Sequence, residues 1–145
     1  MKKWFVLILI SSLLLVSACN NNDKLSGQTF NVAYTPVLQE DVDSPNRYDS
    51  IMTLEFLDGN VVTDSTYDGE GTYELIDEEL ALHFENENEN LEIKFIVKKS
   101  DKDFSEYSAL ISDAKFDVTD TDKISHFKNL TLKLTKNMPI EFLKK

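Results

Sequence analysis

The sequence predicts an all-β domain in which about eight antiparallel strands run as an up-and-down meander and close into a small barrel. From residue 51 onward, apolar and polar side chains alternate with a period of two, which places successive side chains on opposite faces of a strand. Turn-forming pairs such as Asp58-Gly59 and Asp77-Glu78 separate the runs. Such a meander can also stack as a sandwich, but a barrel is favoured because only closure removes the edge strands.

The alternating runs predict the strands in order along the chain. They lie at 30–35, 52–56, 61–63, 72–75, 80–84, 91–97, 108–118 and 130–135. Asp103 is a plausible N-cap with Glu106 three residues on, so one helical turn is expected at 104–107, before the seventh strand. The polar run 85–90 is expected to be an exposed hairpin tip.

Two segments do not follow the alternation. Residues 37–50 contain Pro45 and several acidic side chains without a sustained period, which predicts a long connection of the kind that often carries function. The C-terminal segment 137–145 contains the apolar residues Met138, Ile140, Phe142 and Leu143. Either these residues fold back and cap the barrel, which is favoured, or they form a docking segment for a partner.

The first nineteen residues have the layout of a bacterial export signal. Lys2 and Lys3 precede an apolar run from Trp4 to Val16, and the small residues Ser17 and Ala18 lead to Cys19. The apolar run is too short for a stable membrane span. Val16 to Cys19 resembles the lipobox of bacterial lipoproteins, which implies a signal peptide at 1–18, cleavage between Ala18 and Cys19, and a diacylglycerol on the Cys19 thiol. An ordinary secretory signal is the alternative.

Cys19 is the only cysteine, so the chain has no disulfide framework, and lipid modification gives the exported thiol a purpose. The two acyl chains of a diacylglycerol anchor a protein stably, whereas one chain binds only marginally. We therefore expect a lipid anchor on the extracytoplasmic face of the cell membrane, with residues 19–26 as lipidated cysteine and tether and 27–145 as a single domain. Few glycines and many Lys and Asn favour a Gram-positive cell surface.

The domain is strongly acidic. The 126 residues beyond Cys19 carry 13 basic and 26 acidic side chains, a net charge of −13. Such a surface repels polyanions, and no cluster of Lys or Arg is dense enough for phosphate contacts along a nucleic acid. Nucleic acid is therefore not expected as a partner, and the acidity is expected mainly to keep an exported domain dispersed.

No catalytic or metal-binding motif is predicted. His83 and His126 are the only histidines, no Gly-x-Ser-x-Gly motif occurs, and the paired carboxylates fall in turns, where burial does not raise their pKa. The acidic stretches 64–70 and 117–122 offer oxygen ligands for calcium but lack the central glycine and terminal glutamate of an EF-hand loop. We predict a protein that is not an enzyme and has no metal or cofactor.

The order of turn and strand motifs resembles the lipocalin-like domains of bacterial lipoproteins. The resemblance rests on the segments 25–30 (Leu-Ser-Gly-Gln-Thr-Phe), 53–59 (Thr-Leu-Glu-Phe-Leu-Asp-Gly) and 71–75 (Gly-Thr-Tyr-Glu-Leu). It implies an up-and-down barrel in which Gly27 precedes the first strand and Phe30 plugs the closed end. Where the family has Gly-x-Trp, this chain has Gly27-Gln28-Thr29-Phe30.

Two functions follow as alternatives. The first is a lipoprotein whose barrel binds a small apolar ligand among the inward aromatic side chains Tyr34, Phe56, Tyr73, Phe84, Phe95 and Phe116. The second is an interaction or inhibitor module that engages another envelope protein, such as a basic hydrolase, through the 37–50 loop, the hairpin tips and the acidic surface. Eight strands enclose an interior that bulky side chains can fill completely, so a cavity would favour the first function and an exposed apolar patch the second.

Overall fold

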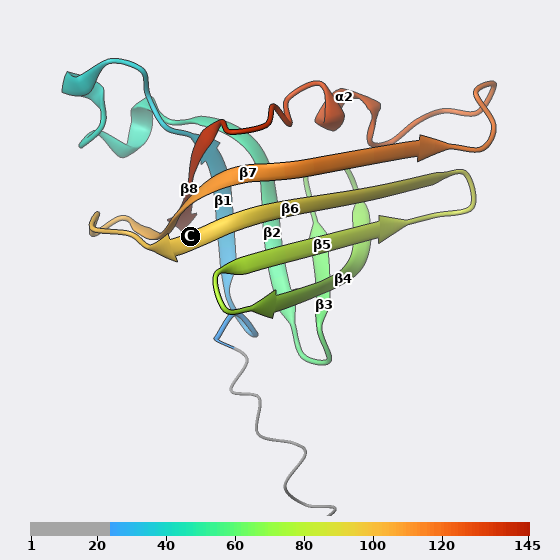
Figure 1. Cartoon of the computed structure of the whole chain (residues 1–145), viewed down its shortest axis with the longest axis horizontal. Coiled ribbons are helices and arrows are strands. Elements are labelled where there is room, and N and C mark those ends of the chain that lie inside the picture. Colours follow the sequence, from blue (N-terminus) through green and yellow to red (C-terminus); the bar gives the residue numbers. More distant parts are fainter. Residues whose placement is uncertain (1–23) are drawn as a thin grey trace, which may run out of the picture.

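A computed structural model describes residues 24–145 and shows a closed barrel of eight antiparallel strands that neighbour one another in sequence order (Figure 1). The predicted all-β meander barrel is thus confirmed, and the sandwich is excluded. The predicted signal peptide, the cleavage site at Ala18 and the lipidation site at Cys19 lie outside the described residues. The strands are β1 Thr29–Tyr34, β2 Asp49–Leu57, β3 Val61–Asp64, β4 Gly69–Ile76, β5 Glu79–Glu85, β6 Glu89–Lys99, β7 Ser105–Val118 and β8 Pro139–Lys144.

Pairing of the first and last strands closes the barrel. Phe30 lies opposite Lys144, and Tyr34 lies opposite Ile140. Register shifts occur in β1 at Val32/Ala33 and in the β6–β7 pair at Lys94/Phe95. Such bulges bend the strands and increase their twist, which a small barrel needs in order to close.

The inward side chains pack into one aromatic core. The Phe30 ring lies 6.0 Å from Phe56 and 5.8 Å from Phe142, Phe56 lies 4.8 Å from Tyr73, and Phe95 lies 5.6 Å from Phe142, all edge to face. This geometry is favourable for aromatic pairs beyond the area that they bury. Phe30 is only 1% exposed, so it fills the end of the barrel where β1 begins.

One glycine is required by a close backbone approach. A Cβ atom at Gly71 on β4 would lie 2.0 Å from the His83 carbonyl oxygen on β5, so no larger residue fits without moving a strand. At the β2–β3 turn, Gly59 and Asn60 both have positive φ, the conformation that glycine and asparagine tolerate best.

The predicted strand at 130–135 is wrong. Lys128–Thr131 forms a short helix, α2, and the eighth strand of the barrel is Pro139–Lys144 instead. The apolar residues Leu130 and Leu134 are both buried, whereas Leu132 is 77% exposed. Leu130 is buried from α2 and Leu134 from the turn after it, in which the Leu134 N–H donates to the Thr131 carbonyl oxygen at 3.2 Å, so the period-two pattern of the three leucines does not form a strand.

The predicted helical turn at 104–107 is also wrong, because Ser105 already belongs to β7 and pairs with Leu143 of β8. Phe104 instead packs its ring 5.6 Å from Tyr48 on the outside of the barrel. The C-terminal segment neither caps the barrel nor stands free as a docking segment. It is the closing strand, with Ile140 and Phe142 pointing into the core.

The two ends of the barrel carry different connections. We call the end where β1 begins the near end; its turns at 58–60, 77–78 and 100–104 are short. The opposite, far end carries two long connections. The 35–48 connection joins β1 to β2 through the 3₁₀ helices η1 Gln39–Asp41 and η2 Pro45–Arg47, and the 119–138 connection joins β7 to β8 through α2 (Figure 1).

Candidate functional site

The structure brings the predicted interior residues together in one core. Phe56, Phe84 and Phe95 are completely buried and Tyr73 is 4% exposed, while Tyr34 and Phe116 are half-buried and pack against this cluster. Their rings contact other core side chains rather than lining an open channel. Binding of a small apolar ligand by these residues therefore stays a prediction, and it would require the core to rearrange.

The 119–138 connection covers the far end of the barrel with apolar side chains. Phe127, Leu130 and Leu134 belong to the buried core, and the Phe127 ring lies 5.7 Å from Phe84. Gly69 makes room for this ring, since a Cβ atom there would lie 2.9 Å from Phe127 Cε1. The connection therefore acts as a plug.

A buried carboxylate anchors the plug to β6. Glu89 is 3% exposed and accepts hydrogen bonds from the Ser125 hydroxyl, the His126 backbone N–H (2.9 Å) and the Asn86 amide (3.2 Å). Burial alone would raise the pKa of Glu89, but these hydrogen bonds outweigh it and hold the pKa below its ordinary value. At the other side of the plug, the Tyr34 hydroxyl donates to the Lys133 carbonyl oxygen.

The 35–48 connection lies outside the barrel and exposes two of its apolar residues. Val37 is fully exposed and Leu38 is 58% exposed, beside the acidic residues Glu40, Asp41 and Asp43. Tyr48 braces the connection, because its ring packs with Phe104, Ala33 and Leu143 and its hydroxyl donates to the Val42 carbonyl oxygen at 2.6 Å. An apolar and acidic tip is thus held on a fixed base.

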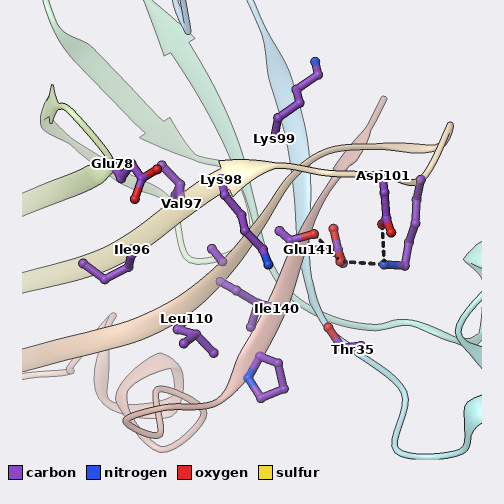
Figure 2. Close-up of a pocket in the computed structure, with 14 residues that line it drawn as sticks. Thr35, Glu78, Ile96, Val97, Lys98, Lys99, Asp101, Leu110, Ile140 and Glu141 are labelled. Atoms are coloured by element: carbon purple, nitrogen blue, oxygen red, sulfur yellow. Dashed lines mark hydrogen bonds and ion pairs between the residues drawn. The ribbon is translucent and has the colours of Figure 1, made fainter.

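A groove of about 620 Å³ crosses the outer face of the barrel over β6, β7 and β8 (Figure 2). Ile96, Leu110 and Pro139 lie directly opposite one another on the three strands, so their outward side chains form one apolar row. Ile96 is 42% and Leu110 43% exposed. The sequence analysis did not predict this row. One residue indicated it: Ile96 is apolar at an outward position of the strand, where Glu92 and Lys94 are charged.

One wall of the groove contains a saturated carboxylate. Glu141 points outward but is 2% exposed, and it accepts hydrogen bonds from the hydroxyls of Ser100 (3.1 Å), Ser105 (2.7 Å) and Ser108 (2.8 Å) and from the Lys102 ammonium (3.1 Å). Burial lowers the pKa of Lys102, but the hydrogen bond and charge of Glu141 outweigh this effect and raise it. The cluster ties the β6–β7 turn to β8.

Asp64, the last residue of β3, is a further buried carboxyl group. It is 1% exposed, its Oδ1 accepts from the Thr66 N–H at 2.9 Å, and within the described chain its Oδ2 has no hydrogen-bond partner. Burial raises the pKa of Asp64. Sequence reasoning placed Asp64 in a candidate calcium stretch; the structure turns it into the barrel instead.

Neither the histidines nor the acidic stretches come together at a metal centre in the part of the chain that the structure describes. His83 lies on the outer face as expected and its Nε2 is 3.6 Å from Glu85. Across residues 24–145, no three His, Cys, Asp or Glu side chains are placed to hold one ion. Among the same residues, no helix is long and apolar enough to span a membrane.

Comparison with known proteins identifies no relative from which a site could be transferred. No family model matches the chain, and no curated protein or solved structure is similar to it at a significant level. What supports a function is therefore the plugged and filled interior, the braced 35–48 connection and the outer groove.

Proposed function

We propose that this chain is a lipoprotein without catalytic activity, anchored on the extracytoplasmic face of the membrane through Cys19, that works as an interaction module. Its contact element is the 35–48 connection. The observation that carries the proposal is the full exposure of Val37 next to Leu38 on a connection that Tyr48 fixes to the barrel. Water contact with apolar side chains is unfavourable, and a fixed conformation reduces the ordering cost of binding.

The chemistry of this tip defines its partner. Glu40 and Asp43 are exposed beside the apolar pair Val37 and Leu38. Opposite charges across an interface steer association and fix register, while an apolar anchor in a desolvated pocket supplies binding energy. The partner is therefore an envelope protein with a basic surface around an apolar pocket, as a basic hydrolase would offer.

The filled interior supports this function over a ligand carrier. Phe56, Phe84 and Phe95 are in contact with other rings, and Phe127 covers the far end. A carrier would need its plug to leave and its aromatic core to open. Native mass spectrometry of the processed protein tests this point: a reproducible small-molecule adduct would establish a carrier, whereas a bare chain agrees with a filled barrel.

The anchor is tested separately. Cells expressing the full chain are fed an alkyne fatty acid, and labelling of the wild-type protein is compared with that of Cys19→Ala. We expect label on the wild type alone, recovered with the membrane fraction. A wild-type protein without label, released into the medium, would show an ordinary secretory signal and overturn the lipoprotein assignment.

The contact element is tested by photo-cross-linking in cells. Benzoylphenylalanine replaces Leu38, which is 58% exposed, in one variant and Leu132 of the plug, which is 77% exposed, in a control. We expect one discrete cross-linked species from position 38 that disappears when Glu40 and Asp43 are changed to Lys. The same species from both positions, or one that survives the charge reversal, would contradict the proposal.

A further inference from the structure

A second surface remains after the contact element is assigned, namely the apolar row of Ile96, Leu110 and Pro139 in the outer groove. These side chains point away from the barrel core on three adjacent strands. Val37 and Leu38 of the contact element do not line the groove, so the two surfaces are separate. A run of exposed apolar side chains beside a groove of about 620 Å³ indicates a binding surface.

The charges along the groove nearly balance, although the domain as a whole is strongly acidic. Three basic and three acidic side chains line it, namely Lys98, Lys99, Lys102, Glu78, Asp101 and Glu141. Of the 13 basic and 26 acidic side chains beyond Cys19, 10 basic and 23 acidic ones therefore lie elsewhere. Two copies of the domain repel each other across most of their surfaces and least across this face, whereas a basic protein is attracted to the acidic remainder.

A second row runs beside the apolar one and carries opposite charges at its two ends. Lys98 on β6 lies opposite Ser108 on β7, which lies opposite Glu141 on β8. At one end, the Lys98 side chain extends over the groove (Figure 2), and within residues 24–145 no ion pair or hydrogen bond occupies its ammonium group. At the other end, Lys102 is a single cation against Glu141 and Asp101, so that wall of the groove keeps a negative excess.

Both rows have their middle residue on β7, which makes the face self-complementary. A two-fold axis that runs along β7 places β6 of one copy over β8 of the other. Ile96 then lies on Pro139, Leu110 lies on Leu110, and Lys98 lies over the negative wall at Asp101. Apolar side chains meet apolar side chains, and the unpaired cation meets the negative excess, twice in each pair of copies.

We propose that the outer groove is the contact face between two copies of this chain, related by a two-fold axis along β7. The direction of this axis rests on the proposed anchor at Cys19. Lys24 lies five residues beyond Cys19 and lines a hollow with Asp77 of the near-end turn, so two copies held in one membrane meet with their near ends side by side. Val37 and Leu38 stay outside the contact, and the pair presents two contact elements.

Thiol cross-linking in the membrane tests the face. The full chain is expressed with Leu110→Cys, the membranes are treated with a short bis-maleimide, and two differently tagged copies show whether a product contains this chain twice. We expect at least about tenfold more cross-linked dimer than with Ile124→Cys, the control on the far-end plug, where Ile124 is 87% exposed. Random collisions of anchored chains would cross-link both positions equally.

An exchange of charges between copies tests the register. One tagged copy carries Lys98→Glu and the other Asp101→Lys, each together with Leu110→Cys. Either variant alone brings like charges together at two contacts, whereas the mixed pair has opposite charges at both. We therefore expect each unmixed variant to give about tenfold less dimer than the Leu110→Cys chain, and the mixed pair to recover it. Lys98→Arg should retain cross-linking.

Equal cross-linking at positions 110 and 124, no dimer at position 110, or charge variants that behave alike when mixed and unmixed would each overturn the proposed face. The anchor fails in a different way. An acylated Cys19 has no free thiol, so the chain without added cysteine should give no product. A product from that chain would refute the anchor, and the same comparisons in the Cys19→Ala background would then decide the face.

Discussion

The two long connections at the far end of the barrel treat their apolar residues in opposite ways. The 119–138 connection buries Phe127, Leu130 and Leu134 in the core, whereas the 35–48 connection leaves Val37 completely exposed. Both connections are fixed by side-chain contacts, through Glu89 in the first and Tyr48 in the second. The comparison separates apolar residues that stabilise the fold from apolar residues that are available for binding.

The largest expected effect is the loss of the plug. Phe127→Ala removes a side chain that is 2% exposed and in contact with Phe84, so we expect the free energy of unfolding to fall by about 3–5 kcal/mol. Val37→Ala, the matched change in the other connection, should alter it by less than about 0.5 kcal/mol. Urea unfolding of both variants measures the difference. A similar fall in the free energy of unfolding for both variants would show that the two connections do not differ in their contribution to stability.

Gly69→Ala tests the seat of the plug without touching the plug itself. The added Cβ would meet the Phe127 ring at 2.9 Å, so the ring must move or the strand must shift, at a cost of about 1–3 kcal/mol. Combined with Phe127→Ala, the glycine change should cost much less, because only the tight contact with Phe84 Cδ1 at 3.3 Å remains. An additive double mutant would mean that another contact makes Gly69 necessary.

Acid should loosen the plug before it affects the 35–48 connection. Because the pKa of Glu89 in the folded chain lies below its ordinary value of 4.5, ionised Glu89 stabilises the fold above that value. This stability is lost as the pH falls through the lower folded pKa. Glu89→Gln should cost about 1–2 kcal/mol at neutral pH and flatten the pH dependence of hydrogen exchange in 119–138. An unchanged pH profile in the variant would show that Glu89 is not the acid-sensitive anchor.

The smallest expected effect concerns the brace of the exposed connection. Tyr48→Phe removes only the hydrogen bond to the Val42 carbonyl oxygen, so we expect a loss of about 1 kcal/mol or less in global stability. Amide exchange should quicken in 35–48 and remain unchanged in 119–138. Faster exchange in both connections would mean that they are coupled through the barrel.

The sequence predicted the barrel well because alternation is a local signal. The inward positions of Leu80, Leu82 and Phe84 follow directly from their spacing. The prediction failed at 130–135, where the structure buries Leu130 from α2 and Leu134 from the turn that follows it. It also failed at 104–107, because the strand pairing of Ser105 with Leu143 is a contact between residues far apart in the sequence, and capping residues report only local preference.

The candidate site was less accessible to sequence reasoning. The 37–50 loop was recognised because it has no periodicity, but its brace was not, since Tyr48 meets Phe104 only in the folded chain. The outer groove depends on register across three strands, which places Ile96, Leu110 and Pro139 side by side. The filling of the interior likewise depends on the plug, whose position no single segment specifies.

Closure of the barrel by β1 and β8 has a consequence for biogenesis. Phe30 meets Phe142, and Lys144 pairs with Phe30, across more than a hundred residues of chain. Bringing such distant segments together is slow, because loop-closure entropy is lost before the contacts form. Until the last strand has been delivered, β1 and β7 each present an unpaired edge to neighbouring chains. Folding therefore finishes only after synthesis of the C-terminal residues, and a chain that stalls before Pro139 would be prone to aggregate.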